Sequence, residues 1–300
     1  MDRKRVIYLI VILFIQINLF SQDDDLMNML SNDEPSTEYT NATFKTTLLV
    51  IGQTIETPLN GSLLFNVQHR FGTINSGGYE FFGLDQATTR IGFQYGVNNW
   101  LAIGIGRSSY NKTYDGWLKV KILRQSTGLK NNPVSIDYYG NMGITSLKWT
   151  EPERKNYFSS RISYANQILL ARKLSPGVSL QLMPTYVHYN LVESSEYDNN
   201  VFSVGGGGRF KVSSRISLNI EYYVLLSKQT SKQYSNPLSV GIDIETGGHV
   251  FQLYATNAEG IIEQHFIGRT SGKWQNGDIH IGFNISRSFQ IKKPREFRDK

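Results

Sequence analysis

The feature that most constrains the fold is a two-residue alternation of apolar and polar side chains. In residues 62–72, SLLFNVQHRFG, apolar side chains occupy one parity, and Asn66, Gln68 and Arg70 occupy the other. Successive side chains of a β-strand point to opposite faces, so this stretch is a strand with one apolar and one polar face. A charged face behind an aromatic row is typical of a wall with lipid outside and water inside, as in a transmembrane β-barrel.

The same alternation returns along nearly the whole chain. It recurs near residues 90–97, 101–106, 114–124, 134–145, 158–170, 178–186, 201–210, 216–226, 238–245, 251–255 and 279–286. Together with the first segment these make twelve strands, and bacterial barrels have even strand numbers. We therefore predict an all-β fold, a single antiparallel up-and-down transmembrane barrel of about 12 strands in residues 45–291.

The connections between these segments support the same topology. Short turns near 98–99, 174–177, 213–214 and 247–248 alternate with long polar stretches near 72–87, 147–156, 190–200, 227–236 and 257–276. Short periplasmic turns and long extracellular loops follow this pattern in outer-membrane barrels. The second hairpin departs from it, because 110–113 is short where a loop is expected and 125–132 is long for a turn.

The two ends of the chain differ from the barrel. Residues 1–21 combine a basic start, an apolar run and a small residue, which predicts a cleaved signal peptide. We interpret residues 22–44 as a flexible periplasmic lead-in and 292–300 as a basic, solvated tail. Residues 46–57, TTLLVIGQTIET, fit either an additional strand or a segment that packs inside or under the barrel.

Several short motifs resemble those of a known family. They are residues 68–72 (QHRFG), 82–85 (FGLD), 90–92 (RIG) and 103–108 (IGIGRS), followed by Lys112, 114–116 (YDG) and Lys121. The set resembles a family of outer-membrane β-barrel proteins of unknown function from Bacteroidota, over about residues 44–289. The resemblance implies a barrel and an outer-membrane location, and it supplies no substrate and no catalytic residue.

Charged side chains on the polar parity are the candidate functional residues. The set is Arg70, Arg90, Lys119, Lys121, Asp137, Arg161, Arg209, Glu221, Asp243 and Glu245. Arginine or lysine facing lipid at mid-depth would cost about 2–4 kcal/mol, so we expect all ten to face the lumen. They would then line an ion-selective pore, or pair with one another in a closed polar core.

The sequence contains little that suggests catalysis, metal binding or nucleic-acid binding. No cysteine is present, which excludes a lipoprotein anchor, disulfides and thiolate metal sites. The five histidines are not clustered as metal ligands are, and no GxSxG motif occurs. Only His188 with Ser194 could serve a hydrolase near a strand end. The four glycines at 205–208 lack the rest of a phosphate-binding loop, so we expect them to bend the wall.

The sequence thus predicts a narrow channel or small-solute transporter without a cofactor, metal or catalytic site. One alternative is a closed structural barrel whose loops or lead-in bind a periplasmic or surface partner. A second is a barrel-embedded lipid-modifying enzyme. The expected partners are the outer-membrane bilayer, the barrel assembly machinery and a small solute. Nucleic acid is not expected, and the oligomeric state stays open.

Overall fold

The computed structural model describes residues 36–228, 230–246 and 249–292. The signal peptide at 1–21, residues 22–35 of the lead-in and residues 293–300 of the basic tail lie outside the described residues. These three assignments therefore stay predictions.

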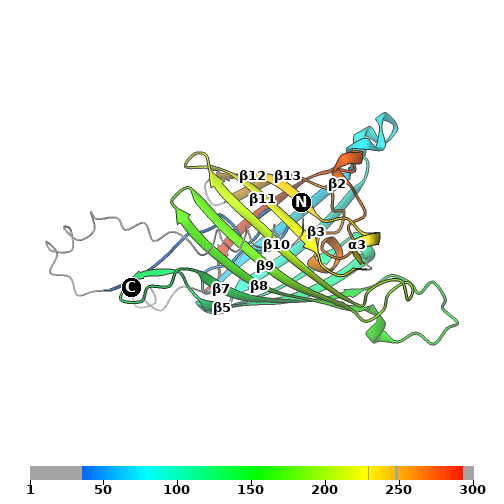
Figure 1. The fold of residues 1–300 in the computed structure, drawn as a ribbon, viewed down its shortest axis with the longest axis horizontal. Helices are drawn as coiled ribbons and strands as arrows, with labels where there is room; N and C mark the ends of the chain where they lie inside the picture. Colours follow the sequence, from blue (N-terminus) through cyan, green and yellow to red (C-terminus); the bar gives the residue numbers. More distant parts are fainter. Residues whose placement is uncertain (1–35, 229, 247–248, 293–300) are drawn as a thin grey trace.

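Twelve antiparallel strands close into one barrel, which confirms the predicted fold class (Figure 1). The strands are β2 (Ser62–Thr73), β3 (Ala87–Gly96), β4 (Leu101–Ser108), β5 (Thr113–Leu123), β7 (Ser135–Thr145), β8 (Ile162–Ser175), β9 (Val178–Tyr189), β10 (Asn200–Lys211), β11 (Ile216–Leu225), β12 (Leu238–Thr246), β13 (His249–Thr256) and β14 (His280–Gln290). Each strand pairs with the next along the chain, and β14 pairs with β2 to close the wall. Because Gln290 lies opposite Ser62, the barrel begins and ends at the same rim.

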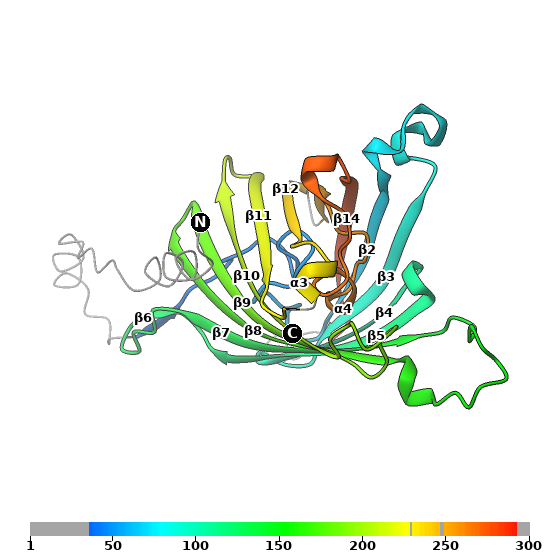
Figure 2. The same ribbon diagram turned by 45° about the vertical axis from the view of Figure 1, so that its right-hand side comes forward.

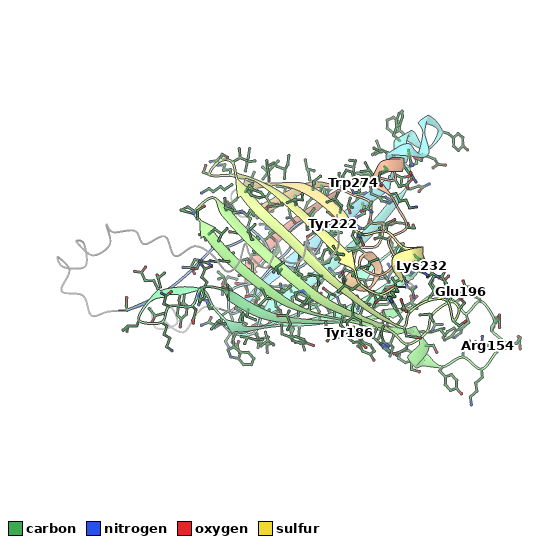
Figure 3. All side chains as sticks on the ribbon, viewed as in Figure 1. Arg154, Tyr186, Glu196, Tyr222, Lys232 and Trp274 are labelled. Carbon is green, nitrogen blue, oxygen red and sulfur yellow. The ribbon has the colours of Figure 1, made fainter. Side chains whose placement is uncertain are left out.

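The two faces of the wall have the chemistry that the alternation predicts. In β11, Ile220 is 43% exposed on the outer face, whereas its neighbour Glu221 is 1% exposed on the inner face. Tyr186 and Tyr222 lie on the outer wall (Figure 3). Exposed Ile, Leu and Phe side chains cover the rest of this face, as a lipid-facing surface requires.

The rims differ in the length of their connections. We call the rim with the turns near 97–100, 176–177 and 212–215 the short-turn end, and the opposite rim the long-loop end. At the long-loop end lie the short helices η1 (Ile74–Ser76), η2 (Gly78–Gly83), η3 (Tyr110–Lys112), η4 (Phe158–Arg161), α3 (Thr230–Gln233), α4 (Glu263–Phe266) and η5 (Trp274–Asn276). In both views the β2–β3 and β7–β8 connections stand clear of the rim (Figure 2). Within the described ranges, no helix is both long and apolar enough to cross a membrane.

The long turn at 125–132 has a structural reason. It contains β6 (Ser126–Gly128), which pairs with β1 (Thr37–Tyr39) in a two-stranded sheet separate from the barrel (Figure 2). Gly128 has φ of +87°, and a side chain there would meet the carbonyl oxygen of Ser36. The chain that precedes the barrel is therefore attached to the short-turn end before it continues to β2.

Candidate functional site

The lumen is occupied by a segment that precedes the first barrel strand. We call residues 43–56 the N-terminal plug. Leu49, Val50 and Ile51 are each 1% exposed, although they belong to no barrel strand. The plug folds as a small hairpin, in which Leu48 pairs with Gln53 and Leu49 N–H donates to Gly52 O at 2.8 Å. Of the two interpretations of residues 46–57, the structure supports a segment packed inside the barrel and excludes an additional wall strand.

Glu221 of β11 binds the turn of this hairpin. Its carboxylate accepts hydrogen bonds from the backbone N–H of Ile51 at 2.9 Å and Gly52 at 3.0 Å on Oε1. Oε2 accepts from Val50 N–H at 3.3 Å and again from Gly52 N–H at 3.2 Å. Three successive amides thus converge on one buried carboxylate, a charge-assisted arrangement stronger than neutral hydrogen bonds.

Amide side chains of three other strands bind the plug backbone. Gln252 of β13 donates to the carbonyls of Leu48 and Leu49, both at 3.2 Å. Asn284 of β14 donates to Val50 O at 2.9 Å. On the facing wall, Gln181 of β9 donates to Gln53 O at 2.7 Å and accepts from Ile55 N–H at 3.1 Å.

Two cations complete this set of contacts. The Nζ of Lys119 donates to Thr54 O at 2.6 Å and to Glu56 O at 3.0 Å. Arg209 donates to Thr43 O at 3.2 Å. These contacts come from β5, β9, β10, β11, β13 and β14, and β12 adds an ion pair between Glu245 and Lys45 of the plug.

Two of the four glycines of β10, Gly205 and Gly207, provide space for packing inside the wall. A side chain at Gly207 would lie 2.4 Å from Leu49 of the plug, and one at Gly205 would lie 2.4 Å from the ring of Tyr223. The β10 pairing with both neighbours continues through this run without a register shift. The unbroken pairing shows that this run contains no bulge, and Gly205 and Gly207 permit close approach of Tyr223 and of the plug. The expected bend stays a prediction.

A second segment enters the lumen from the long-loop end. We call residues 257–270 the β13–β14 segment. Arg70, fully buried, donates to Ala258 O at 2.7 Å and to Gly260 O at 2.6 Å. Ile267 and Phe266 of this segment are fully buried as well. Unlike the plug, this segment is continuous with barrel strands on both sides.

The two internal segments meet at Glu263. Gln53 of the plug donates to Glu263 Oε1 at 3.2 Å, while Tyr139 and Asn141 of β7 donate to Oε2, both at 3.1 Å. Burial raises the pKa of the Glu263 carboxyl. The middle of the barrel is thus crossed by a continuous hydrogen-bonded network.

The structure places nine of the ten predicted lumen residues on the inner face of a barrel strand. Arg70, Arg90, Lys119, Asp137, Arg209, Glu221 and Asp243 are buried, and Lys121 and Glu245 are half-buried near the short-turn end. Arg161 lies instead in η4 at the long-loop end, before β8 begins. Its guanidinium donates to Thr145 O and Leu147 O and lies 4.0 Å from the centroid of the Trp149 ring, so the loop holds it at the long-loop rim and not on the inner face of a strand.

Most of the buried charges are stabilised by hydrogen bonds to the internal segments. Within the described ranges, two ion pairs form, Arg90 with Asp115 and Lys45 of the plug with Glu245. The Arg90–Asp115 pair is bidentate, and its Nε–Oδ1 distance is 2.9 Å. Arg70, Lys119 and Arg209 bond instead to backbone carbonyls of the two inserted segments. The predicted lumen residues therefore do not form ion pairs with one another within the described ranges.

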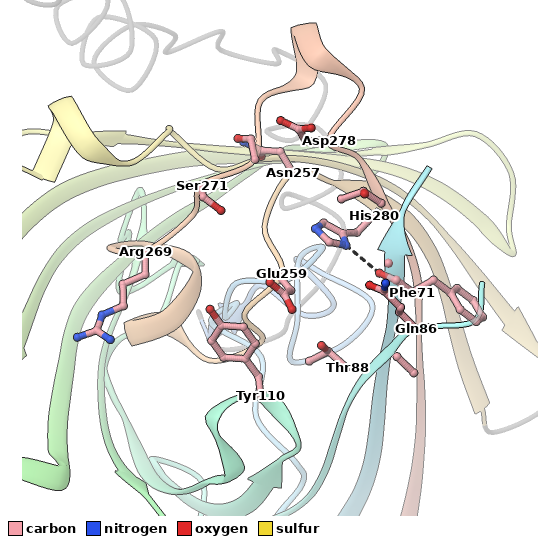
Figure 4. Close-up of a pocket in the computed structure, with 14 residues that line it drawn as sticks. Phe71, Gln86, Thr88, Tyr110, Asn257, Glu259, Arg269, Ser271, Asp278 and His280 are labelled. Atoms are coloured by element: carbon pink, nitrogen blue, oxygen red, sulfur yellow. Dashed lines mark hydrogen bonds between the residues drawn. The ribbon is translucent and has the colours of Figure 1, made fainter. Parts of the chain in front are cut away.

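Among the cavities formed by the described residues, two large polar ones lie at opposite ends of the barrel. The long-loop cavity has a volume of about 550 Å³, and Tyr110, Glu259, Thr88 and His280 project into it (Figure 4). His280 Nδ1 bonds to Phe71 O at 2.8 Å. Burial raises the pKa of the Glu259 carboxyl, and the nearby positive charge of Arg70 opposes this shift.

The short-turn cavity, about 500 Å³, is lined by both flanks of the plug, residues 40–45 and 55–60. Lys121, Arg124 and Asp137 of the wall also line it. The plug therefore enters and leaves the lumen through the same rim.

The catalytic and metal alternatives receive no geometric support from the described residues. His188 Nδ1 bonds to Asn200 Oδ1 at 2.7 Å, whereas Ser194 Oγ accepts from the Glu196 N–H. Within the described part of the chain, no three His, Asp or Glu side chains gather as metal ligands would. Burial lowers the pKa of His265 to about 3, which keeps it neutral at ordinary pH.

Sequence reasoning missed the residues on the β13–β14 segment. Residues 257–276 were interpreted as a polar loop, yet they contain Ile261, Ile262, Phe266 and Ile267 around Glu263. Four large apolar residues in an extracellular loop were the available signal for burial. Gln181, Gln252 and Asn284 lay on the predicted inner parity, but nothing local marked them as ligands of a backbone.

Comparison with known proteins places the chain among membrane barrels. A family model described as "Membrane bound beta barrel domain (DUF5777)" matches residues 44–289. Among curated proteins, none matches the sequence. Among solved structures, the NanC porin shares 10% identity with a TM-score of 0.48, over 76% of this chain and 98% of that one. The KdgM porin shares 9% identity with a TM-score of 0.46, over 76% and 99%.

The outer membrane phospholipase A from Escherichia coli is also similar. It shares 8% identity with a TM-score of 0.40, over 77% of this chain and 93% of that one. These similarities are too weak to carry an argument about activity.

Proposed function

Because the chain belongs to the DUF5777 family of membrane-bound β-barrel domains, we propose that it is a gated small-solute channel of the outer membrane. In this proposal the β13–β14 segment narrows the lumen permanently, and the N-terminal plug closes the remainder. The state described here is the closed state. Signal-directed export, folding by the barrel assembly machinery and an origin in Bacteroidota belong to the same proposal.

One observation carries the proposal, namely that the plug is held in the lumen without belonging to the wall. Both of its flanks line the cavity at the short-turn end. Its withdrawal through that rim would break side-chain contacts and leave every pairing between barrel strands intact. The vacated lumen would be lined by Glu221, Lys119 and Arg209, and charged linings of this kind set ion selectivity.

Conductance in planar bilayers tests the proposal. Ile51→Asp places a second carboxylate beside Glu221 and should expel the plug, because two buried like charges repel. We expect the wild-type barrel to be closed for most of the recording and the Ile51→Asp barrel to conduct. The matched control is Leu59→Asp, since Leu59 is 75% exposed on the plug flank and should leave the barrel closed.

The second candidate is a permanently closed docking barrel, which the filled lumen also favours. Folded Ile51→Asp protein that stays as silent as wild type would support this candidate over the channel. Swelling of liposomes in small sugars provides an independent readout of the same difference.

Orientation is tested separately by thiol labelling on whole cells. We propose that the short-turn end faces the periplasm. Cysteine at Ser195 in a long loop should then react with a membrane-impermeant reagent, and cysteine at Ser175, the last residue of β8 at the short-turn end, should not. The reverse pattern would invert the orientation.

A further inference from the structure

Most polar contacts between wall and plug reach the main chain of the plug, whereas the Lys45–Glu245 ion pair and the Thr46–Ser286 contact join side chains. Glu221 binds N–H groups, Gln252, Asn284, Lys119 and Arg209 bind carbonyls, and Gln181 binds one of each. We propose that the lumen is a peptide-binding site, and that residues 43–56 are its resident ligand. The same segment supplied from another chain would bind in its place. This inference rests on the proposed function, because the resident plug must be able to leave.

The wall complements both polarities of a peptide backbone. Near the hairpin turn, Glu221 accepts from three successive N–H groups while Asn284 donates to Val50 O, which lies between them. On the facing wall, Gln181 binds the backbone of Gln53 and Ile55. These groups are common to every residue type except proline, so they fix the shape and direction of the ligand more than its sequence.

Selectivity comes from the space available at three plug positions. A side chain at Gly52 would lie 2.2 Å from Tyr223 Oη, so this position requires glycine. Leu49 fills the notch above Gly207, and Val50 Cγ1 lies 3.2 Å from the position of a side chain at Gly241. The ligand class is therefore a short hairpin with consecutive apolar residues followed by glycine.

The other plug side chains contribute less to recognition. Thr47 is 4% exposed, and its hydroxyl has no hydrogen-bond partner. Replacement of this hydroxyl should not weaken binding. Thr47 thus offers a neutral control within the same peptide.

The test uses the full-length assembled barrel after the chain has been cleaved at a single site. A specific protease site replaces Leu59 and Asn60, which are both exposed on the plug flank, and cleavage follows assembly. A dye on cysteine at Glu38, which is exposed and lies on the same fragment, reports whether the native fragment leaves. Fluorescence anisotropy then measures binding of a synthetic, labelled peptide of residues 40–58.

We expect the wild-type peptide to bind. Two altered peptides should bind at least about tenfold more weakly, because one loses charge-assisted hydrogen bonds and the other introduces a steric clash. One carries N-methyl groups at Ile51 and Gly52, which removes two donors to Glu221 without changing any side chain. The other carries Gly52→Ala. A peptide with Thr47→Ala should bind like wild type, within about threefold.

A matched barrel variant identifies the contact. Glu221→Gln in the wall should weaken the wild-type peptide and add little to the loss already caused by N-methylation, because both remove the same bonds. Equal binding of the N-methylated and wild-type peptides would overturn recognition of the main chain.

The remaining outcomes separate this inference from the proposed function. If the native fragment leaves and the added peptide does not bind, the peptide site is wrong and the gate stands. If the native fragment never leaves the cleaved barrel, the proposal of a gated channel is wrong. The proposal of an exchangeable peptide-binding site is then wrong as well.

Discussion

Glu221→Gln is the most direct perturbation of the closed state. Glutamine keeps one acceptor oxygen for the turn of the plug. It loses the bonds that Oε2 accepts from Val50 at 3.3 Å and Gly52 at 3.2 Å, and it turns an NH₂ donor toward backbone donors. Hydrogen bonds to a charged group contribute about 1.5–3 kcal/mol, so we expect the closed state to lose about 2 kcal/mol. That loss corresponds to about a 30-fold rise in the ratio of open to closed barrels.

Thiol labelling inside the lumen measures this ratio. The chain contains no cysteine, and Thr47 is buried with an unpartnered hydroxyl, so Thr47→Cys introduces one nearly isosteric probe. When opening is rapid compared with labelling, the labelling rate follows the open fraction. Glu221→Gln should therefore raise the rate about 30-fold in the Thr47→Cys background.

The control for this experiment is Glu245→Gln. Glu245 pairs with Lys45 of the plug, but its side chain is 44% exposed, and pairs of this kind contribute about 0–1 kcal/mol. The labelling rate of the Glu245→Gln variant should rise by less than about fivefold. Equal labelling rates for Glu221→Gln and the parent would refute the reasoning, because Glu221 would then not hold the plug.

Three further outcomes are expected. Ile220→Arg places a charge in hydrocarbon on the outer face and should destabilise the assembled barrel by about 2–4 kcal/mol. Unboiled gels should then show less of the heat-modifiable barrel, and assembly equal to that of wild type would contradict the face assignment. Gly207→Leu should displace the plug and increase conductance, whereas Gly116→Ala, whose Cβ would meet only an atom 4.0 Å away, should change neither. Asp115→Asn removes the counter-ion of buried Arg90, which keeps only its hydrogen bond to Gln68, and should lower the free energy of unfolding by about 3–5 kcal/mol in urea titrations. An unchanged midpoint would show that the pair is dispensable.

The wall was predictable from the sequence because its determinants are local. Each strand carries its own alternation, and a shift of one residue would move charged side chains into lipid. The alternation therefore specified all twelve strands and the inner position of residues such as Glu221.

The plug was not predictable in the same way because its pattern is ambiguous. TTLLVIGQTIET has the apolar content of a strand, and only contacts with side chains 63 to 240 residues away place it in the lumen. The glycines of β10 were a clue to such contacts. Glycines at alternate positions, such as Gly205 and Gly207, leave room on the inner face for another segment to approach, and Leu49 of the plug fills the space at Gly207.

The inner charges explain why the lumen could be filled without a matching set of ion pairs. From the sequence, the wall residues Glu221 and Lys119 could be expected to form an ion pair with each other. In the structure each of them binds the backbone of the plug instead. A backbone offers N–H and C=O groups in alternation, so it satisfies an acidic and a basic wall residue within a few positions of one chain. The desolvation cost of a buried charge is met whenever such groups converge on it. A mixed-sign lining in a narrow barrel is therefore a signal of an inserted polypeptide as much as of a pore.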